Sequence, residues 1–377
     1  MRHRRSLVGV VLTFLVLGAC AGGTPDPQKD PRAVKGFDPR MRSALEQTLE
    51  KQFENSGVPG MAATVIVEGR GEWSSARGLA DVDAKREVTT RTPFAQGSIT
   101  KLMVAALTLR LAERGELSLD DRLGSLVRRP PPGSSGLPLR RLLAQTGGLN
   151  DTPEATFKAI FRRRNARYTV AQTLRGVRAV RAPGKFAYGN ANYLLVGQAI
   201  ERATGTSVAA ALHQELMDPL GLSDIRLQPD ERADPQTAHG YDQSGGDVGD
   251  GSRYVPYTSV GLTAWTAGGV VASAQSTARF GHALFSGHAL KPESLRAMVR
   301  FGEAETYWEG YGLGVARSEV HAHEVWGHGG RIPGFASELW HLPRERMTLA
   351  VVVNDEGWPV EDTAAELMYA AVEREAQ

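Results

Sequence analysis

Apolar and polar positions recur along this chain with two different periods, one helical and one extended. Residues 39–54 carry an apolar side chain every three to four positions: Met41, Leu45, Leu49 and Phe53. This spacing predicts an amphipathic helix. Asp38 followed by Pro39 is a typical helix start, because a carboxylate caps free N–H groups and proline suits the first helical position.

A hairpin and a second helix are expected next. The run 61–67 is apolar and β-branched, and the polar turn 68–71 leads into a second strand. From 98 to 114 the spacing is helical again, with Leu102, Ala105, Ala106, Leu109 and Ala112 on one side. Gly115 ends that helix.

The rest of the chain predicts a helical middle and a strand-rich end. Residues 105–225 are mostly helical segments between Gly/Pro stretches, and 228–256 are polar enough for a long surface loop. Strands are expected at 324–327, 335–342 and 347–354, followed by a last helix at 361–374. This order predicts an α+β sandwich. An antiparallel sheet shared by the early and late strands is flanked by helices, and a mostly helical lobe of about 105–255 is inserted.

Composition excludes several classes of protein. The chain has 377 residues, with 44 basic against 42 acidic side chains and 41% hydrophobic residues. No apolar run reaches the roughly 18 residues that a membrane-spanning helix needs. Three arginines, Arg2, Arg4 and Arg5, lie in the first 20 residues, so the rest carries 44 − 3 = 41 basic against 42 acidic groups. That balance argues against a nucleic-acid partner.

The first 20 residues are typical of an export signal. A basic start precedes an apolar stretch, Leu7 to Leu17, that is too short to cross a bilayer. Leu17-Gly18-Ala19-Cys20 resembles the bacterial lipobox, in which the cysteine is lipidated, and Cys20 is the one cysteine of the chain. We therefore expect a signal peptide at 1–19, a flexible tether at 20–37 and a catalytic domain at 38–377. The protein would be anchored to the bacterial membrane, on its periplasmic or extracellular face. The alternative is an ordinary signal peptide with an incidental cysteine.

A serine and a lysine open the helix predicted at 98–114. In Ser98-Ile99-Thr100-Lys101, the lysine lies one turn after the serine and on the same face. A serine hydroxyl needs a base to become a nucleophile, and a lysine can be that base if its pKa falls. The alternative interpretation is an ordinary helix start with an exposed lysine.

Two further motifs could complete such a site. Tyr188-Gly189-Asn190 precedes a helix expected at 192–202, where a phenol could exchange a proton and an amide could orient a substrate. Gly327-His328-Gly329-Gly330 lies on or next to a strand, and its glycines would let an extended substrate approach. Alone, the first motif is better explained by a packed tyrosine ring with Asn190 capping the helix. The alternative for the second is a tight turn with a solvated histidine.

In this order the three motifs resemble those of the serine β-lactamase and penicillin-binding protein family. The resemblance is to its class C and DD-peptidase-like branch, whose motifs are Ser-x-x-Lys, Tyr-x-Asn and Lys/His-x-Gly. It covers about residues 40–375. It includes the segments 58–61, 142–149, 267–269 and 311–314.

The resemblance implies a role for each matching residue. Ser98 would be acylated, Lys101 would accept its proton, and Tyr188 would be a second acid/base; which of the two is the general base stays open. His328 would be a further catalytic residue, standing where the family has lysine or histidine, and could donate a hydrogen bond or a proton to a leaving group. Asn190, Gly329, Gly330 and Arg331 would contact the substrate, with the backbone N–H groups of Ser98 and Arg331 holding the oxyanion. No metal or other cofactor is required, and we expect no zinc site at His321 and His323.

Departures from the family pattern bear on the substrate. His328 replaces the lysine of most class C β-lactamases, and an imidazole is a weaker partner for a β-lactam carboxylate. Ala144-Gln145 and Gly147 stand where relatives read Thr-His and Ser, and Ser276 replaces an aspartate. We therefore expect a DD-peptidase-like or esterase-like hydrolase acting on a small molecule or peptide. A β-lactamase and a penicillin-binding sensor that barely turns over are the alternatives. Arg317 or Arg331 could bind a substrate carboxylate.

Overall fold

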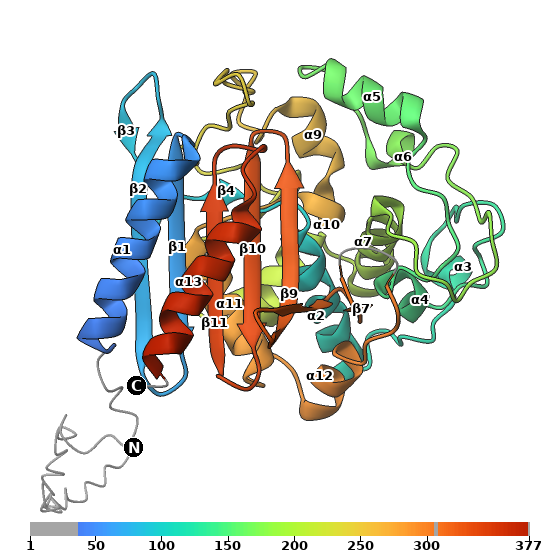
Figure 1. The fold of residues 1–377 in the computed structure, drawn as a ribbon. Coiled ribbons are helices and arrows are strands. Elements are labelled where there is room, and N and C mark those ends of the chain that lie inside the picture. The colour runs from blue at the N-terminus through green and yellow to red at the C-terminus, as the bar shows by residue number, and fades with distance from the viewer. Residues whose placement is uncertain (1–36, 305–307, 376–377) are drawn as a thin grey trace, which may run out of the picture.

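A computed structural model describes residues 37–304 and 308–375 (Figure 1). The predicted signal peptide and tether, including Cys20, lie outside these residues except for Phe37. None of the helices in the described part of the chain combines the length and the apolar composition that a bilayer crossing needs.

One antiparallel sheet of eight strands organises the molecule. Its strands are, in spatial order, β3 (Arg86–Glu87), β2 (Gly71–Asp81), β1 (Gly60–Val67), β11 (Met347–Val353), β10 (Phe335–Leu342), β9 (His323–Ile332), β8 (Ala316–Val320) and β7 (Gly310–Tyr311). The first long strand therefore pairs with the last, in a register from Met61 opposite Val353 to Val67 opposite Met347. The expectation that early and late strands share one sheet is confirmed.

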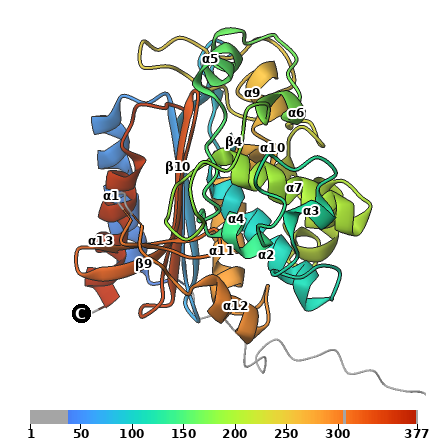
Figure 2. The same cartoon turned by 90° about the vertical axis from the view of Figure 1, so that its right-hand side faces the viewer.

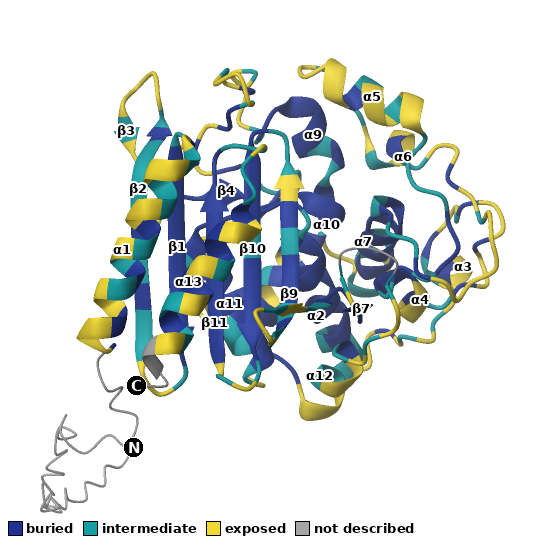
Figure 3. Ribbon diagram, in the orientation of Figure 1, coloured by how far each residue is buried: buried dark blue, intermediate teal, exposed yellow. Residues whose placement is uncertain are grey.

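Two helices from the ends of the chain cover one face of this sheet. These are α1 (Pro39–Ser56) and α13 (Val360–Glu375), which lie side by side in Figures 1 and 2. The predicted start of α1 is confirmed, because the backbone N–H of Arg40 donates to Oδ1 of Asp38 over 2.8 Å. The buried face of α1 carries Met41, Leu45 and Leu49, and the outer faces of both helices are exposed (Figure 3).

The opposite face of the sheet carries α2 (Ile99–Glu113) and α11 (Ala274–Phe285), and beyond them the helical lobe (Figure 2). A small second sheet is formed by β4 (Phe94–Ala95), β6 (Val270–Ala272) and β5 (Arg226–Leu227). The remaining helices are α3 (Leu123–Leu126), α4 (Leu139–Leu143), α5 (Glu154–Arg162), α6 (Val170–Thr173), α7 (Asn190–Thr204), α8 (Val208–Leu212), the π-helix η1 (His213–Met217), α9 (Thr258–Thr263), α10 (Trp265–Gly268) and α12 (Pro292–Met298). The lobe boundaries of about 105 and 255 stay a prediction.

Helix α2 departs from the one-sided pattern that we expected. Every residue from Ile99 to Leu109 is buried, because the helix lies between the sheet and the helical lobe. A helix enclosed on all sides needs no polar face. It is therefore an element of the core, and Ser98 lies at its N-terminus.

The last part of the sheet is more extensive than expected. Strand β9 runs to Ile332 rather than ending at Gly327, and the preceding strand β8 was not predicted. Gly327, Gly329 and Gly330 conceal the end of β9 in the sequence, because glycine is depleted in strands. Beyond Gly327, β9 pairs with β10 but no longer with β8, so its other edge is open.

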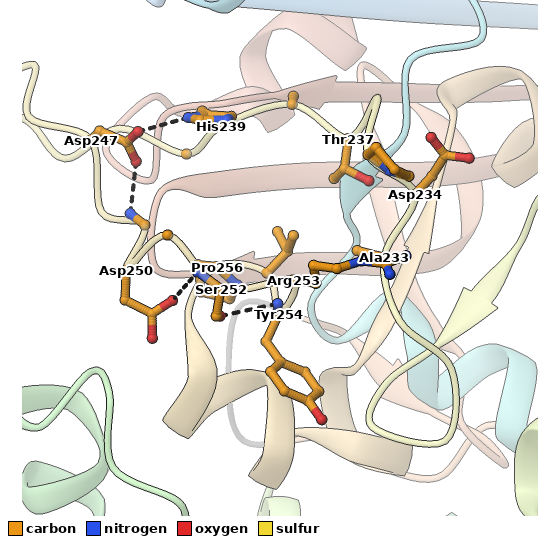
Figure 4. A pocket seen from close by; sticks show the side chains of 16 residues that line it. Ala233, Asp234, Thr237, His239, Asp247, Asp250, Ser252, Arg253, Tyr254 and Pro256 are labelled. Atoms are coloured by element: carbon orange, nitrogen blue, oxygen red, sulfur yellow. Dashed lines mark hydrogen bonds and ion pairs between the residues drawn. The ribbon is translucent and has the colours of Figure 1, made fainter.

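The long loop expected at 228–256 has no helix or strand between Leu227 and Thr258, but it is less superficial than predicted. Ala238, Tyr241 and Val248 are buried. The backbone N–H of Val82 donates to the hydroxyl of Tyr241 over 2.8 Å. The loop surrounds a cavity of about 390 Å³, in which His239 and Asp247 form an ion pair at 2.7 Å (Figure 4).

Candidate active site

Ser98 lies at the first turn of α2, where it caps the helix by position but not by its side chain. Its Oγ is 2.9 Å from Nζ of Lys101 and receives a hydrogen bond from the hydroxyl of Tyr188 over 2.8 Å. Residues 90 positions apart in the chain thus meet at one oxygen atom. The three residues that the sequence singled out for proton transfer are brought together.

Lys101 is fully buried and has three neighbours within hydrogen-bond distance of Nζ. These are Oγ of Ser98 at 2.9 Å, Oδ1 of Asn190 at 2.9 Å and the carbonyl oxygen of Ala267 at 2.6 Å. Burial lowers the pKa of Lys101 from 10.5 to about 7, although the carboxylate of Asp151 acts to raise it. At neutral pH the amine therefore exchanges readily between its charged and neutral forms.

The Tyr188 motif is held in place by Gln145. The side-chain oxygen of Gln145 accepts hydrogen bonds from the backbone N–H of Gly189, over 3.1 Å, and from Nδ2 of Asn192, over 2.6 Å. Gln145 is buried and adopts a left-handed backbone conformation, with φ at 58°. Asn190 is the first residue of α7. The glutamine that departs from the family pattern therefore positions the turn between Tyr188 and α7.

His328 lies on β9 behind Tyr188 and is almost fully buried, with 1% of its surface exposed. Its Nδ1 is 2.6 Å from the carbonyl oxygen of Gly329, and its Nε2 is 3.1 Å from the hydroxyl of Tyr311. Burial, together with the nearby charge of Lys101, lowers the pKa of His328 from 6.5 to about 3. The imidazole is therefore neutral at any ordinary pH.

Close backbone contacts fix the loop before Ser98 against β9. A Cβ atom at Gly330 would lie 2.0 Å from the carbonyl oxygen of Gln96, and one at Gly97 would lie 2.9 Å from the backbone nitrogen of Arg331. Gly97 also has a positive φ of 49°, which favours glycine. These contacts bring the backbone of Arg331 beside Gly97, the residue before Ser98, and the oxyanion site itself stays a prediction.

The side chain of Arg331 is engaged elsewhere. Its guanidinium donates to the carbonyl oxygens of Glu356 and Trp358 and pairs with the carboxylate of Glu361 at 2.8 Å. The guanidinium of Arg317 lies over the ring of Phe301. Arg331 can therefore serve the site through its backbone, while neither guanidinium points to a carboxylate-binding role.

The cavity in front of Ser98 is about 290 Å³ and mostly apolar. Helix α5 contributes Phe157, Ile160 and Phe161, and α9 contributes Val260. Arg331 is the one charged residue among the described residues that line it. Such a lining suits an uncharged, bulky apolar group next to the reacting bond.

The histidines with ligand-like spacing lie apart from this cavity. Nδ1 of His323 is 2.6 Å from Oε1 of Glu345, and the ring of His321 lies beside that of Tyr369. Within the described ranges no three histidine, cysteine or acidic side chains are arranged to hold a metal ion.

Three contributors to the site were missed from the sequence. The carbonyl oxygen of Ala267 leaves no side-chain signal, although the segment 267–269 had already been noted. Tyr311 was noted only as part of the segment 311–314. Gln145 was read as a sign of altered substrate preference, whereas its contacts are structural.

Ser98, Lys101 and Tyr188 thus meet between an antiparallel sheet and a helical lobe. Residues 45–373 match the Beta-lactamase family, so the chain belongs to that family. The expected membership in the β-lactamase and penicillin-binding group of serine hydrolases is confirmed, and so is the predicted fold class.

Two curated relatives carry informative names. A D-aminopeptidase of Brucella anthropi is 26% identical over 88% of this chain, and the match spans 62% of that relative. A putative penicillin-binding protein of Bacillus subtilis is 26% identical over 73% of this chain and 66% of its own length. The chain thus spans about two thirds or less of the length of these relatives.

Solved structures confirm the architecture. D-amino acid amidase from Ochrobactrum anthropi superposes with a TM-score of 0.79 and 22% identity, over 89% of this chain and 99% of the amidase. A penicillin-binding protein homologue from Pyrococcus abyssi superposes with a TM-score of 0.76 and 23% identity, over 88% of this chain and 77% of that protein. At these identities the likeness concerns the fold.

Proposed function

We propose that this chain is an exported, lipid-anchored serine hydrolase that forms an acyl-enzyme on Ser98. Its reaction would be the cleavage of an amide or ester bond in a small D-amino-acid derivative or peptide. The arrangement around Nζ of Lys101 is the observation that carries this proposal.

The partners of Lys101 make it a base for Ser98. A charged ammonium has three protons, and its three neighbours are all hydrogen-bond acceptors. When the amine is neutral, its lone pair needs a donor. The carbonyl of Ala267 and Oδ1 of Asn190 cannot donate, whereas the hydroxyl of Ser98 can. Loss of a proton from Lys101 therefore directs its lone pair at the nucleophile.

The reaction then follows with its protons balanced. Oγ of Ser98 attacks the acyl carbon and its proton passes to Lys101, while the backbone N–H groups of Ser98 and Arg331 hold the oxyanion. The hydroxyl of Tyr188 gives its proton to the leaving amine or alcohol and is reprotonated from Lys101. A water molecule later attacks the acyl-enzyme by the same route in reverse, which returns Ser98 to its starting state.

The substrate class rests on the relatives' names and on the cavity. The curated relative and the solved structure named above are a D-aminopeptidase and a D-amino acid amidase. The apolar lining of Phe157, Phe161 and Val260 suits a bulky side chain on the acyl group. This keeps a DD-peptidase-like or esterase-like activity and adds amides of single D-amino acids.

Penicillin binding is a second candidate, favoured by the relationship to the Bacillus subtilis protein. The uncharged His328 gives no positive charge to a β-lactam carboxylate. We therefore infer that β-lactams are slow substrates or acylating ligands rather than preferred ones.

The test of this function is intact-protein mass spectrometry combined with amidase assays. The protein is incubated with a D-amino acid amide, its L-enantiomer, an activated ester and a penicillin. Ser98→Ala is the test variant, and Ser135→Ala, at an exposed serine, is the matched control. Turnover of the D-amide or the ester that requires Ser98 supports the proposal. Absence of both adduct and turnover with all four compounds contradicts it.

Export and anchoring need their own experiment. A host cell expressing the full chain is fed a radiolabelled fatty acid, and Cys20→Ala is compared with the parent. Label that is incorporated into the parent and lost in the variant supports lipidation of Cys20. An unlabelled parent would leave the ordinary signal peptide as the interpretation of residues 1–20.

A further inference from the structure

Positive charge is concentrated on one segment of a chain that is almost neutral overall. The whole chain has 44 basic and 42 acidic residues, but the stretch 155–200 has two lysines, seven arginines and no acidic residue. The nine are Lys158, Arg162, Arg163, Arg164, Arg167, Arg175, Arg178, Arg181 and Lys185. All nine are exposed.

These charges are scarcely neutralised by the protein itself. Lys158 pairs with Glu154 at 2.5 Å on the same helix, and the guanidinium of Arg164 lies over the ring of Tyr257. In the part of the chain that the structure describes, the other seven form no ion pair with a carboxylate. An exposed stretch of chain with so many unpaired cations attracts anions.

The same segment also exposes large apolar side chains. Phe157 is 44% exposed, Phe161 is 36% exposed and Val180 is 46% exposed. They are three of the five large hydrophobic side chains that are exposed in the described residues. The ring centres of Phe157 and Phe161 lie 4.4 Å apart, so the two side chains form one apolar pair on α5.

Helix α5 packs against the rest of the protein through few of its residues. Ile160 is its buried residue, and the hydroxyl of Ser259 donates to the carbonyl oxygen of Ile160 over 2.6 Å. The rest of the helix is largely exposed and stands at the outer edge of the helical lobe (Figures 1 and 3). It can therefore contact a large, flat partner without clashing with the body.

We propose that this segment, called here the basic ridge (residues 155–185), docks on a bilayer that contains anionic phospholipids. Aromatic side chains together with lysine and arginine are the composition of helices that lie in a membrane interface. The arginines would meet the lipid phosphates while Phe157 and Phe161 enter the acyl boundary. A soluble polyanion would explain the charges but not the exposed aromatic pair.

Docking would orient the active site. Phe157 and Phe161 also line the cavity in front of Ser98, so a docked ridge places the mouth of that cavity at the bilayer surface. The docking depends on neither the chemistry of Ser98 nor the lipid on Cys20. It would hold for the body alone.

Vesicle sedimentation of residues 37–377 tests this proposal. We use this fragment because its fold corresponds to a complete protein: the superposition covers 99% of the solved amidase chain. The probes are vesicles of phosphatidylcholine with and without phosphatidylglycerol, at low and high salt. We expect binding that requires phosphatidylglycerol and weakens with salt.

Matched variants separate the ridge from general charge. Arg162→Gln/Arg163→Gln is compared with Lys51→Gln/Arg344→Gln, which removes two exposed charges elsewhere. Phe157→Ser/Phe161→Ser is compared with Tyr369→Ser, at a tyrosine that is 48% exposed on α13. We expect several-fold weaker binding in both ridge variants and parental binding in both controls.

Three outcomes would overturn the proposal. They are no binding to phosphatidylglycerol vesicles, equal weakening in the control variants, and full binding by the phenylalanine variant. The last would mean that charge alone holds the protein to the vesicles and that the aromatic pair does not enter the bilayer. Circular dichroism of each variant verifies that the fold is retained.

Discussion

The hydroxyl of Tyr311 lies 3.1 Å from Nε2 of His328, and this contact helps to determine which ring nitrogen carries the proton. Because the carbonyl oxygen of Gly329 can only accept, Nδ1 carries the proton and Nε2 accepts from Tyr311. Both ring nitrogens are thus engaged within the protein. His328 acts as a neutral support behind Tyr188, with the two ring centres 6.1 Å apart, rather than as a proton donor.

This arrangement predicts that His328 does not titrate near its ordinary pKa of 6.5. Protonation would require a charge in a buried site beside Lys101, so the ring stays neutral until the pH approaches about 3. Its effect on stability has a definite sign. The unfolded chain binds the proton first, so stability is lost as the pH falls below about 6.5. The measurement is the NMR titration of the His328 ring, and a transition near neutral pH would refute the assignment.

In contrast to His328, Lys101 should titrate near neutral pH and should make the reaction rate depend on pH there. Its neutral form is the base, so kcat/KM rises with pH through about 7 and then levels off. Lys101→Met should lower kcat/KM by about 10²–10⁴-fold, the usual contribution of a general base. Lys51→Met, at an exposed lysine of α1, is the control and should keep the parental rate. A profile that is flat across neutrality would point to Tyr188 as the base.

Sequence reasoning found the elements whose signal is local. The cap at Asp38 and the face of Met41 and Leu45 follow from propensity and period. That the early and late strands share one sheet was inferred from the order of the elements, with neither the pairing nor the register. That register, Met61 opposite Val353, depends on the packed sheet and has no local sign.

The meeting of Ser98, Lys101 and Tyr188 was predicted for a different reason. Ser98, Lys101 and Tyr188 belong to short, continuous sequence motifs that can be recognised directly. Their supporting contacts come from residues far apart in the chain and leave no such motif. The carbonyl oxygen of Ala267 is a backbone atom, and Gln145 is 44 positions from the glycine it holds. Strand β9 was predicted too short because glycine is depleted in strands, whereas Gly330 is needed for the close approach of Gln96.

That close approach predicts a severe effect of Gly330→Ala. The added methyl group would meet the carbonyl oxygen of Gln96 at 2.0 Å, and this oxygen is backbone that accepts from Ser337 over 2.9 Å. Relief of the clash moves the segment before Ser98 away from β9 and opens the oxyanion site. We expect the free energy of unfolding to fall by about 1–3 kcal/mol, as for an overpacked core. We also expect acylation to be slowed by more than this loss of stability alone explains.

The control for this change is Gly136→Ala. A Cβ atom at Gly136 has nothing within 4 Å, so the variant should match the parent in melting temperature and acylation rate. Parental acylation by Gly330→Ala would mean that the loop and the strand do not need their present spacing.

The last prediction concerns Glu338, on the face of β10 toward α13. Burial raises its pKa from 4.5 to about 8, although a hydrogen bond from Nε1 of Trp340 over 2.7 Å acts to lower it. For a raised carboxyl pKa the folded state holds the proton longer, so stability is lost as the pH rises from 4.5 through about 8. Glu338→Gln keeps an acceptor for Trp340 and cannot ionise. Its urea midpoint should equal that of the parent below pH 4.5 and exceed it above about 8.

A variant at an exposed glutamate isolates this effect. Glu319→Gln removes an exposed charge from β8, two strands away in the same sheet, and its urea midpoint should follow that of the parent at both pH values. Because all three proteins share every other titrating group, the difference between the midpoints reports on position 338 alone. An equal gain in both variants would show that the acidic surface as a whole, and not the half-buried carboxyl of Glu338, weakens the fold at high pH.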